Sequence, residues 1–143
     1  MFASILVPID AAHTEAGGKA LALAADIAKT QGGKITVLHV IEFIPGYVAG
    51  QVMSELIEQN RRKSESAIRK VVAAHDPANE IQIILREGHV AREILDYASK
   101  NNVNMIVIAS HNPGPADYIF GSVAAHVVRH AHCSVLVARN CEA

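Results

Sequence analysis

The chemistry that this sequence could perform is concentrated at Gly121 and Ser122, which open the last helical pattern of the chain. Glycine allows a ligand to approach the backbone closely, and a serine at a helix start caps the helix while offering a hydroxyl group to an anion. The free amides of Gly121, Ser122 and Val123 and the positive end of the helix dipole would then face a phosphate. A plain helix cap uses the same two residues, so both interpretations stay open here.

An unusually long connection precedes this pair. It runs from Ser110 to Phe120, whereas connections between a strand and a helix usually take about 2–6 residues. Long surface loops on a rigid scaffold often carry binding residues. We therefore expect this loop to belong to a ligand site.

A carboxylate stands at the end of the first apolar run, in the sequence Pro8, Ile9 and Asp10. An acid at such a place can accept hydrogen bonds from a ribose or an adenine amino group, directly or through a metal ion. Its alternative role is to cap the helix that follows. The second apolar run ends near Val40, which can offer backbone polar groups and an apolar wall to a base.

The elements that must position these residues follow a regular alternation. Several apolar runs have consecutive apolar residues, as in a sheet that is covered on both faces, and helical patterns separate them. The runs are Ser4–Ile9, Lys34–Ile41, Glu80–Arg86, Asn104–Ala109 and Ser134–Arg139. The alternation predicts right-handed crossovers and a doubly wound parallel α/β sheet. In such sheets ligands bind outside the carboxyl ends of the strands, where the winding direction reverses.

Four helical patterns each present an apolar stripe toward this sheet. The first spans residues 14–30 and stops at Gly32, and the second runs from about Ser54 to His75. The third stripe contains Val90, Ile94 and Ala98, and the last contains Ala124, Val127 and Val128. We expect all of these apolar side chains to face inward.

Composition narrows the class of protein. Of 143 residues, 50% are apolar and 19% are charged, which predicts one ordered domain over residues 1–143. The 13 basic residues are balanced by 14 acidic ones, so no positive field favours nucleic acid or an anionic membrane. The amino terminus has no basic segment before its apolar run, and no run approaches the roughly 18 residues of a spanning helix. We expect a soluble cytoplasmic protein with no nucleic-acid or membrane partner.

Metal binding and catalysis have weaker support. His126 and His130 lie one helical turn apart and could share a metal ion, but no HExxH glutamate accompanies them, which favours solvent-facing or structural roles. Cys133 has no CxxC partner and is typical of a small hydrophobic residue. No nucleophile has an identifiable base, and no Walker lysine is present. We therefore predict no metal ligand and no catalytic residue, with slow hydrolysis through bound magnesium as an alternative.

Beyond these motifs, the chain resembles the universal stress protein family over nearly its whole length. The resemblance is carried by ILVPID, VLHVI, EGHVAREILDYA and the segment from IASHNP through YIFGS to SVLVAR. Nucleotide-binding members carry glycine, two residues, glycine, nine residues and then glycine with serine or threonine. Here Ala109 and Asn112 stand at the first two glycines, and eight residues separate Asn112 from the matching Gly121 and Ser122. The loop is similar to that of short bacterial members in which Ala-Ser-His, a variable residue and proline replace the glycines and adenine nucleotides are still bound.

The resemblance implies a Rossmann-like sheet of order 3-2-1-4-5 with helices on both faces. It also implies that the strand Ser134–Arg139 lies at an edge and pairs with its own copy in a homodimer, which would cover an association-prone edge. The nucleotide-binding residues that it implies are Pro8, Ile9, Asp10, Val40, Ile108, Ala109, Ser110, His111, Asn112, Gly121, Ser122 and Val123. Val40 would meet the adenine edge, Ile108 and Ala109 would form the pocket floor, and residues 121–123 would hold phosphate.

The function expected from residues and resemblance together is a dimeric regulatory protein of the stress response. It would bind ATP or AMP, with or without Mg²⁺, and the nucleotide would alter the loops that meet a protein client. The alternative is a dimeric interaction protein of the same fold that works without nucleotide, having lost two motif glycines. A slow ATPase or autophosphorylating enzyme ranks third.

Overall fold

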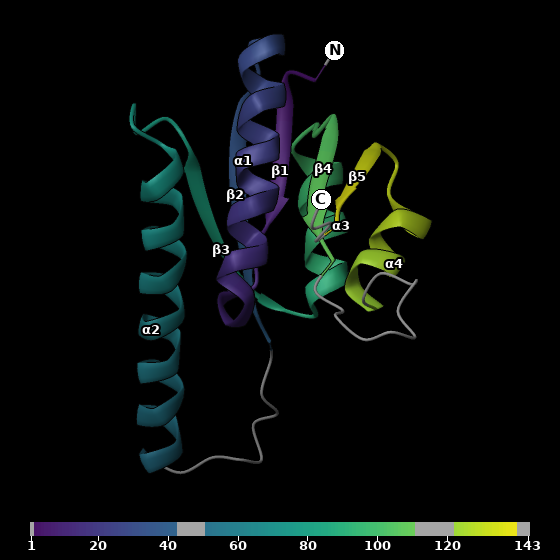
Figure 1. The fold of residues 1–143 in the computed structure, drawn as a ribbon. Helices are drawn as coiled ribbons and strands as arrows, with labels where there is room; N and C mark the ends of the chain where they lie inside the picture. Colours follow the sequence, from purple (N-terminus) through teal and green to yellow (C-terminus); the bar gives the residue numbers. More distant parts are fainter. Residues whose placement is uncertain (1, 43–50, 111–121, 140–143) are drawn as a thin grey trace.

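The computed structural model describes residues 2–42, 51–110 and 122–139, and for residues 51–53 it describes the backbone only. Strands and helices alternate along these residues, as Figure 1 shows. The elements are β1 (Ser4–Pro8), a 3-10 turn η1 (Ala11–His13), α1 (Thr14–Gln31), β2 (Lys34–Glu42), α2 (Gln51–His75), β3 (Gln82–Gly88), α3 (Val90–Lys100), β4 (Met105–Ala109), α4 (Ser122–His130) and β5 (Ser134–Ala138).

The five strands form one parallel sheet in the order β3-β2-β1-β4-β5. This order confirms the predicted doubly wound fold. From β1 the chain winds outward to β2 and β3, and it then returns to the other side of β1 to add β4 and β5. The switch of winding direction lies between β1 and β4, which is where ligands bind in open sheets of this kind.

Two apolar clusters cover the two faces of the sheet. On what we call the α1/α2 face, Val7 packs with Leu21 of α1 and Ile68 of α2. On the α3/α4 face, Ile106 packs with Ile94 of α3 and Val127 of α4. Figure 1 shows α1 in front of the sheet and α3 behind it. Burial on both faces explains why β1 and β4 are continuous apolar runs.

The first helix ends where the sequence predicts. Gly32 adopts a left-handed conformation with φ of 67°, and its amide donates to the carbonyl of Ala28. A residue without a side chain is the common choice at such a helix end.

The third strand departs from its predicted bounds, because it begins at Gln82 rather than Glu80 and runs on to Gly88. The reason is Asp76, whose carboxylate accepts hydrogen bonds from the amides of Glu80 and Ile81, both at 2.9 Å. These two residues are therefore held in the turn after α2, and the strand starts beyond them.

The inward orientation predicted for Val128 is wrong. Ala124 and Val127 of α4 are buried, but Val128 is 41% exposed. Helix α4 lies over the outermost strand, so only a narrow side of it has a neighbour to pack against.

No helix within residues 2–42, 51–110 and 122–139 is both long and apolar enough to cross a membrane.

Candidate functional site

Several predicted site residues lie at the edge of the sheet where the strands end, which we call the carboxyl edge. Because all strands are parallel, Asp10 after β1, Val40 in β2 and Ser110 after β4 lie at this same edge. Helix α4 also starts there with Ser122, since it leads the chain back from β4 to the start of β5. The switch point thus has an acid, two hydroxyl groups and a helix N-terminus around it.

Strand alternation determines which of these side chains share a face. Val40 and Ile108 belong to the cluster on the α3/α4 face, and residues two positions further along a strand point to the same face. Ser110 follows Ile108 by two residues. Asp10 follows the buried Ile9 of the opposite cluster and keeps an extended conformation, with φ of −89° and ψ of 124°. Both polar side chains are therefore assigned to the α3/α4 face, beside Val40.

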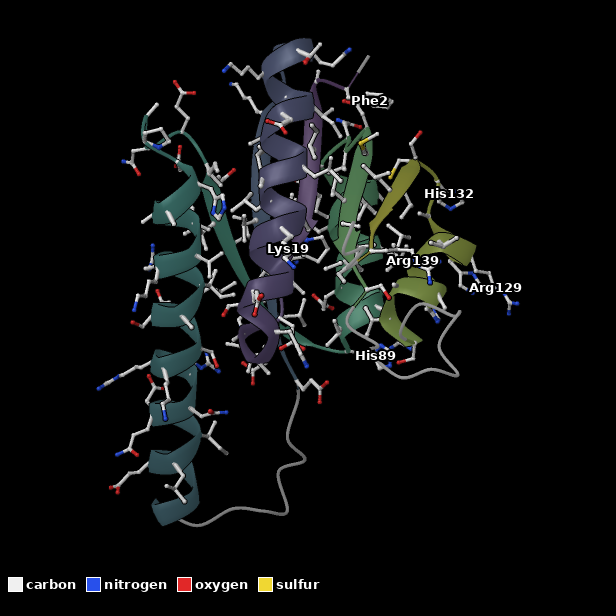
Figure 2. All side chains as sticks on the ribbon, viewed as in Figure 1. Phe2, Lys19, His89, Arg129, His132 and Arg139 are labelled. Atoms are coloured by element: carbon white, nitrogen blue, oxygen red, sulfur yellow. The ribbon has the colours of Figure 1, made fainter. Side chains whose placement is uncertain are left out.

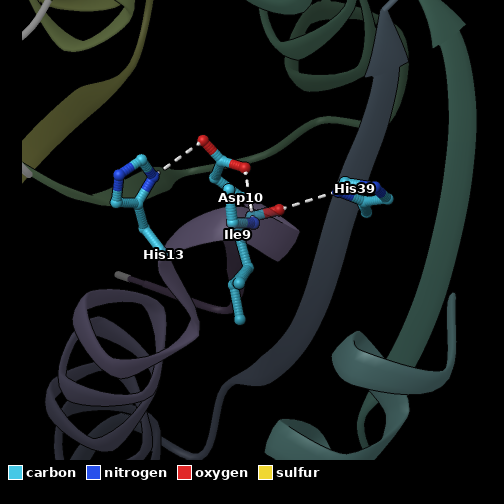
Figure 3. Close-up of polar contacts among 5 residues, drawn as sticks. Ile9, Asp10, His13 and His39 are labelled. Carbon is cyan, nitrogen blue, oxygen red and sulfur yellow. Dashed lines mark hydrogen bonds and ion pairs between the residues drawn. The ribbon is translucent and has the colours of Figure 1, made fainter. Parts of the chain in front are cut away.

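Asp10 has local hydrogen-bond partners, as Figure 3 shows. Its Oδ1 accepts from the amide of Ala12 at 2.9 Å, and its Oδ2 lies 3.1 Å from Nδ1 of His13. Asp10 therefore caps the turn Ala11–His13, which is the alternative role weighed for it. The side chain is 49% exposed, so solvent still reaches the carboxylate.

His39 is a residue of this edge that the sequence analysis passed over. It is only 6% exposed, and its Nδ1 lies 3.0 Å from the carbonyl oxygen of Ile9 (Figure 3). The amide of Ile9 donates to the carbonyl of Leu38 at 3.0 Å. These two bonds tie the end of β1 to β2 and fix the backbone just before Asp10. Its position among apolar strand residues could have indicated this role, because a buried histidine ring needs a hydrogen-bond partner.

The side chains of Ile9 and Ala109 point away from the α3/α4 face. Both belong to the cluster on the α1/α2 face, and Gly17 of α1 packs so closely on Ile9 that an added Cβ would overlap the Cγ2 of Ile9. Only their backbone groups can face a ligand beside Val40. The side chains of Val40 and Ile108 are 8% and 5% exposed, so they form a wall rather than polar contacts.

The remaining predicted residues differ in what they can offer. The amide of Ser110 donates to the carbonyl of Ala138 at 3.0 Å, which leaves its hydroxyl group for other contacts. Ser122 is exposed at the start of α4, whereas Val123 packs against the core. The predicted residues His111, Asn112 and Gly121 lie outside the described residues.

A groove lies at the opposite edge of the sheet, away from the predicted site. It has a volume of about 610 Å³ and runs between α3 and α4. Asp96, His126, His130, His132 and Cys133 are among the residues that line it. Burial raises the pKa of the Cys133 thiol above its usual value, which lowers its thiolate fraction.

This groove gathers histidines without forming a metal site of three ligands among the residues that the structure describes. The rings of His126 and His130 lie 4.6 Å apart between centroids, and both residues are exposed, as predicted.

A five-stranded parallel sheet of order β3-β2-β1-β4-β5 with helices on both faces defines the class of doubly wound α/β domains. Residues 1–139 match the universal stress protein family, and the chain belongs to that family.

Curated relatives and solved structures agree with this assignment. Universal stress protein YxiE of Bacillus subtilis is 29% identical, covering 97% of this chain and 100% of its own length. Universal stress protein UspA from Lactobacillus plantarum superimposes with a TM-score of 0.78 at 27% identity, covering 96% and 98% of the two chains. A universal stress protein solved in complex with cAMP superimposes with a TM-score of 0.59 at 17% identity, covering 94% of each chain.

Proposed function

We propose that this protein binds an adenine nucleotide, ATP or AMP, at the carboxyl edge of its sheet and acts as a regulator in the stress response. The observation that supports the proposal is the parallel strand order, which puts Asp10, Val40, Ser110 and the start of α4 at the same edge of the sheet. The adenine ring would lie against the apolar wall of Val40 and Ile108. Asp10 would accept from the ribose, and the phosphates would reach the first turn of α4.

The chemistry of the edge fits such a ligand. Anions are favoured at helix N-termini, because the first amides are unpaired and the helix dipole is positive there. A structural neighbour was solved with cAMP, and this supports the idea that the fold can accommodate an adenine nucleotide. The function would then follow from nucleotide-dependent changes in the surface that a client protein meets.

Calorimetric titration of nucleotide-free protein with AMP, and with ATP in the presence of Mg²⁺, tests the proposal. Asp10→Ala removes an acceptor from the ribose, and we expect affinity for AMP to fall roughly tenfold, the size of one charged hydrogen bond. Asp10→Asn keeps a good helix cap and one acceptor oxygen, so it should lose less. The matched control is Asp26→Ala, an exposed acid on α1, which should change nothing. The absence of heat with both nucleotides would reject the proposal.

A second function, a nucleotide-independent interaction protein, is favoured by different observations. Asp10 already caps a turn, the amide of Ser110 is already paired, and a groove of about 610 Å³ lies at the other edge. Mass spectrometry of small molecules released from freshly purified protein separates the two functions. An adenine nucleotide in that fraction supports the first, and its consistent absence supports the second.

We further propose that the protein acts as a homodimer through Ser134–Arg139. Strand β5 is an edge strand whose side chains from Val135 to Ala138 are only half-buried. The carbonyl of Ala138 points toward β4, since it accepts from Ser110, so the backbone of Val137 points outward. Val137→Pro should therefore remove an outward amide and reduce the dimer to monomers in light scattering, whereas Val137→Ala should stay dimeric. Identical masses for both variants would contradict this dimer.

A further inference from the structure

Arg139 lies one residue beyond the end of β5, at the carboxyl edge of the sheet. The parallel register pairs Ala109 of β4 with Ala138 of β5, and the amide of Ser110 donates to the carbonyl of Ala138 at 3.0 Å. The ladder therefore continues past the strand ends and places Arg139 next to Ser110. Strand β4 is the strand that leads toward α4.

The alternation along β5 directs Arg139 to the same face as the site. Val135 and Val137 belong to the cluster on the α3/α4 face, and Leu136 and Ala138 belong to the other. Arg139, two residues after Val137, is therefore assigned to the α3/α4 face. Figure 2 shows Arg139 at the end of β5, on the side where α4 lies.

Arg139 is exposed, and no acidic group within the described residues pairs with it. Arg86, the arginine near the end of β3 at this edge, already has contacts of its own. Arg86 of β3 lies 3.8 Å from the carboxylate of Glu93 and 5.4 Å from the ring centroid of Tyr97. Strand β3 is also the far edge of the sheet, whereas β5 is adjacent to β4.

A helix N-terminus provides dipoles but no full charge, and a phosphate chain carries more negative charge the longer it is. An unpaired guanidinium suits phosphate oxygens because its donors form a planar fork. We propose that Arg139 binds the terminal phosphates of a nucleoside di- or triphosphate whose first phosphate lies at the start of α4. This inference rests on the proposed nucleotide site and adds that the site prefers ATP or ADP to AMP, cyclic nucleotide or adenosine.

The test compares Arg139→Gln with Arg129→Gln. Arg129 is a matched control because it is also an exposed arginine without an acidic partner among the described residues, but it lies in the last turn of α4. Figure 2 shows it pointing away from the sheet. ATP, ADP, AMP and adenosine are titrated into both variants and into the unchanged protein by calorimetry, at fixed Mg²⁺ and ionic strength.

We expect Arg139→Gln to weaken ATP and ADP binding at least about tenfold, as for a lost hydrogen bond between charged groups. Affinity for AMP and adenosine should stay within about twofold, and Arg129→Gln should leave all four ligands unchanged. Arg139→Lys, which keeps the charge but not the fork, should recover part of the loss. The ATP affinity of Arg139→Gln should also depend less steeply on salt, because one phosphate contact is gone.

Three results would overturn the inference. If the unchanged protein binds ATP and Arg139→Gln binds it equally well, the role of Arg139 is wrong while the nucleotide site stands. If Arg139→Gln weakens AMP as much as ATP, Arg139 acts on the whole site rather than on terminal phosphates. If the unchanged protein binds none of the four ligands, the proposed function and this inference fail together. Val137→Pro disturbs the proposed pairing of β5 between subunits but keeps the guanidinium of Arg139. It should therefore still prefer ATP, which shows whether the loss in Arg139→Gln comes from the missing charge or from altered β5 pairing.

Discussion

The two edges of the sheet differ in which helix ends they collect. At the carboxyl edge α1, α3 and α4 begin, so their unpaired amides and positive dipole ends collect there. At the opposite edge the same helices end, and their last turns carry Lys29, Lys100, Arg129 and His130. A groove of about 610 Å³ between α3 and α4 lies at the second edge. This groove therefore lies where the helix dipoles are least favourable for an anionic ligand.

Adding a negative charge at each edge in turn tests the difference between the two edges most directly. Ser122→Asp places a carboxylate at the first residue of α4, about 6 Å from a bound phosphate. At an effective dielectric constant of about 20, this repulsion is roughly 2–3 kcal/mol, and ATP affinity should fall about a hundredfold. The free energy of unfolding should meanwhile rise by about 0.3–1 kcal/mol, because the new acid favours the helix dipole.

The matched variant is Ser99→Asp, near the end of α3 in the groove at the opposite edge. It should leave nucleotide affinity unchanged and lower the free energy of unfolding by about 0.3–1 kcal/mol. Calorimetry and urea unfolding of both variants measure these quantities. Equal effects on ATP affinity would show that the carboxyl edge has no special role.

Replacing two histidines, one at each edge, should give the next largest difference, in the free energy of unfolding. His39→Leu removes the donor to the carbonyl of Ile9, and a buried carbonyl left without a partner costs about 1–3 kcal/mol. His132→Leu alters an exposed residue of the groove and should change stability by less than about 0.5 kcal/mol. Urea unfolding monitored by circular dichroism compares them. A loss for His132→Leu as large as that for His39→Leu would contradict the positioning role of His39.

Two adjacent glycines of α1 test how tightly the helix supports the carboxyl edge. A Cβ at Gly17 would overlap Ile9, whereas a Cβ at Gly18 would meet its nearest atom, Cε1 of His75, at 3.5 Å. Gly17→Ala should therefore destabilise the protein by about 1–3 kcal/mol through overpacking. Gly18→Ala should stabilise it by up to about 1 kcal/mol through helix propensity. Thermal unfolding of both variants should give midpoint shifts of opposite sign, and shifts of the same sign would refute the close packing.

The smallest effect concerns the thiol in the groove. Because burial raises the pKa of Cys133, less of it is thiolate near neutral pH. Its alkylation by iodoacetamide at pH 8, followed by peptide mass spectrometry, should be slower than that of N-acetylcysteine. The rate should rise with pH beyond the point where the model thiol has levelled off. A faster reaction than the model thiol would indicate an activating group that the structure does not place there.

Much of the fold was predictable because its signals are local. Continuous apolar runs such as Met105–Ala109 occur in strands covered on both faces. A glycine often ends a helix because it adopts the left-handed conformation readily, as Gly32 does here. The bounds of β3 were missed because they depend on hydrogen bonds from Asp76 to two specific amides. The exposure of Val128 was missed because a helical pattern does not say how much of the helix has a neighbour.

The candidate site was predictable in part. Asp10, Val40, Ser110 and Ser122 were recognised as residues next to strand or helix ends, and the parallel order brings those ends to one edge. The roles of these residues in binding stay predictions. Arg139 was not recognised as a site residue, because its place beside Ser110 depends on the pairing of β4 with β5 across the intervening helix.

The sequence by itself determined the alternation of strands and helices, the acid after the first strand and the serine that begins the last helix, since each depends on neighbours along the chain. Tertiary structure alone decided which side chains share a face. Ser110 and Arg139 are distant in sequence, and only the pairing of β4 with β5 brings them together at the carboxyl edge. The physical reason is that strand pairing sets register and register sets the facing direction of every second residue.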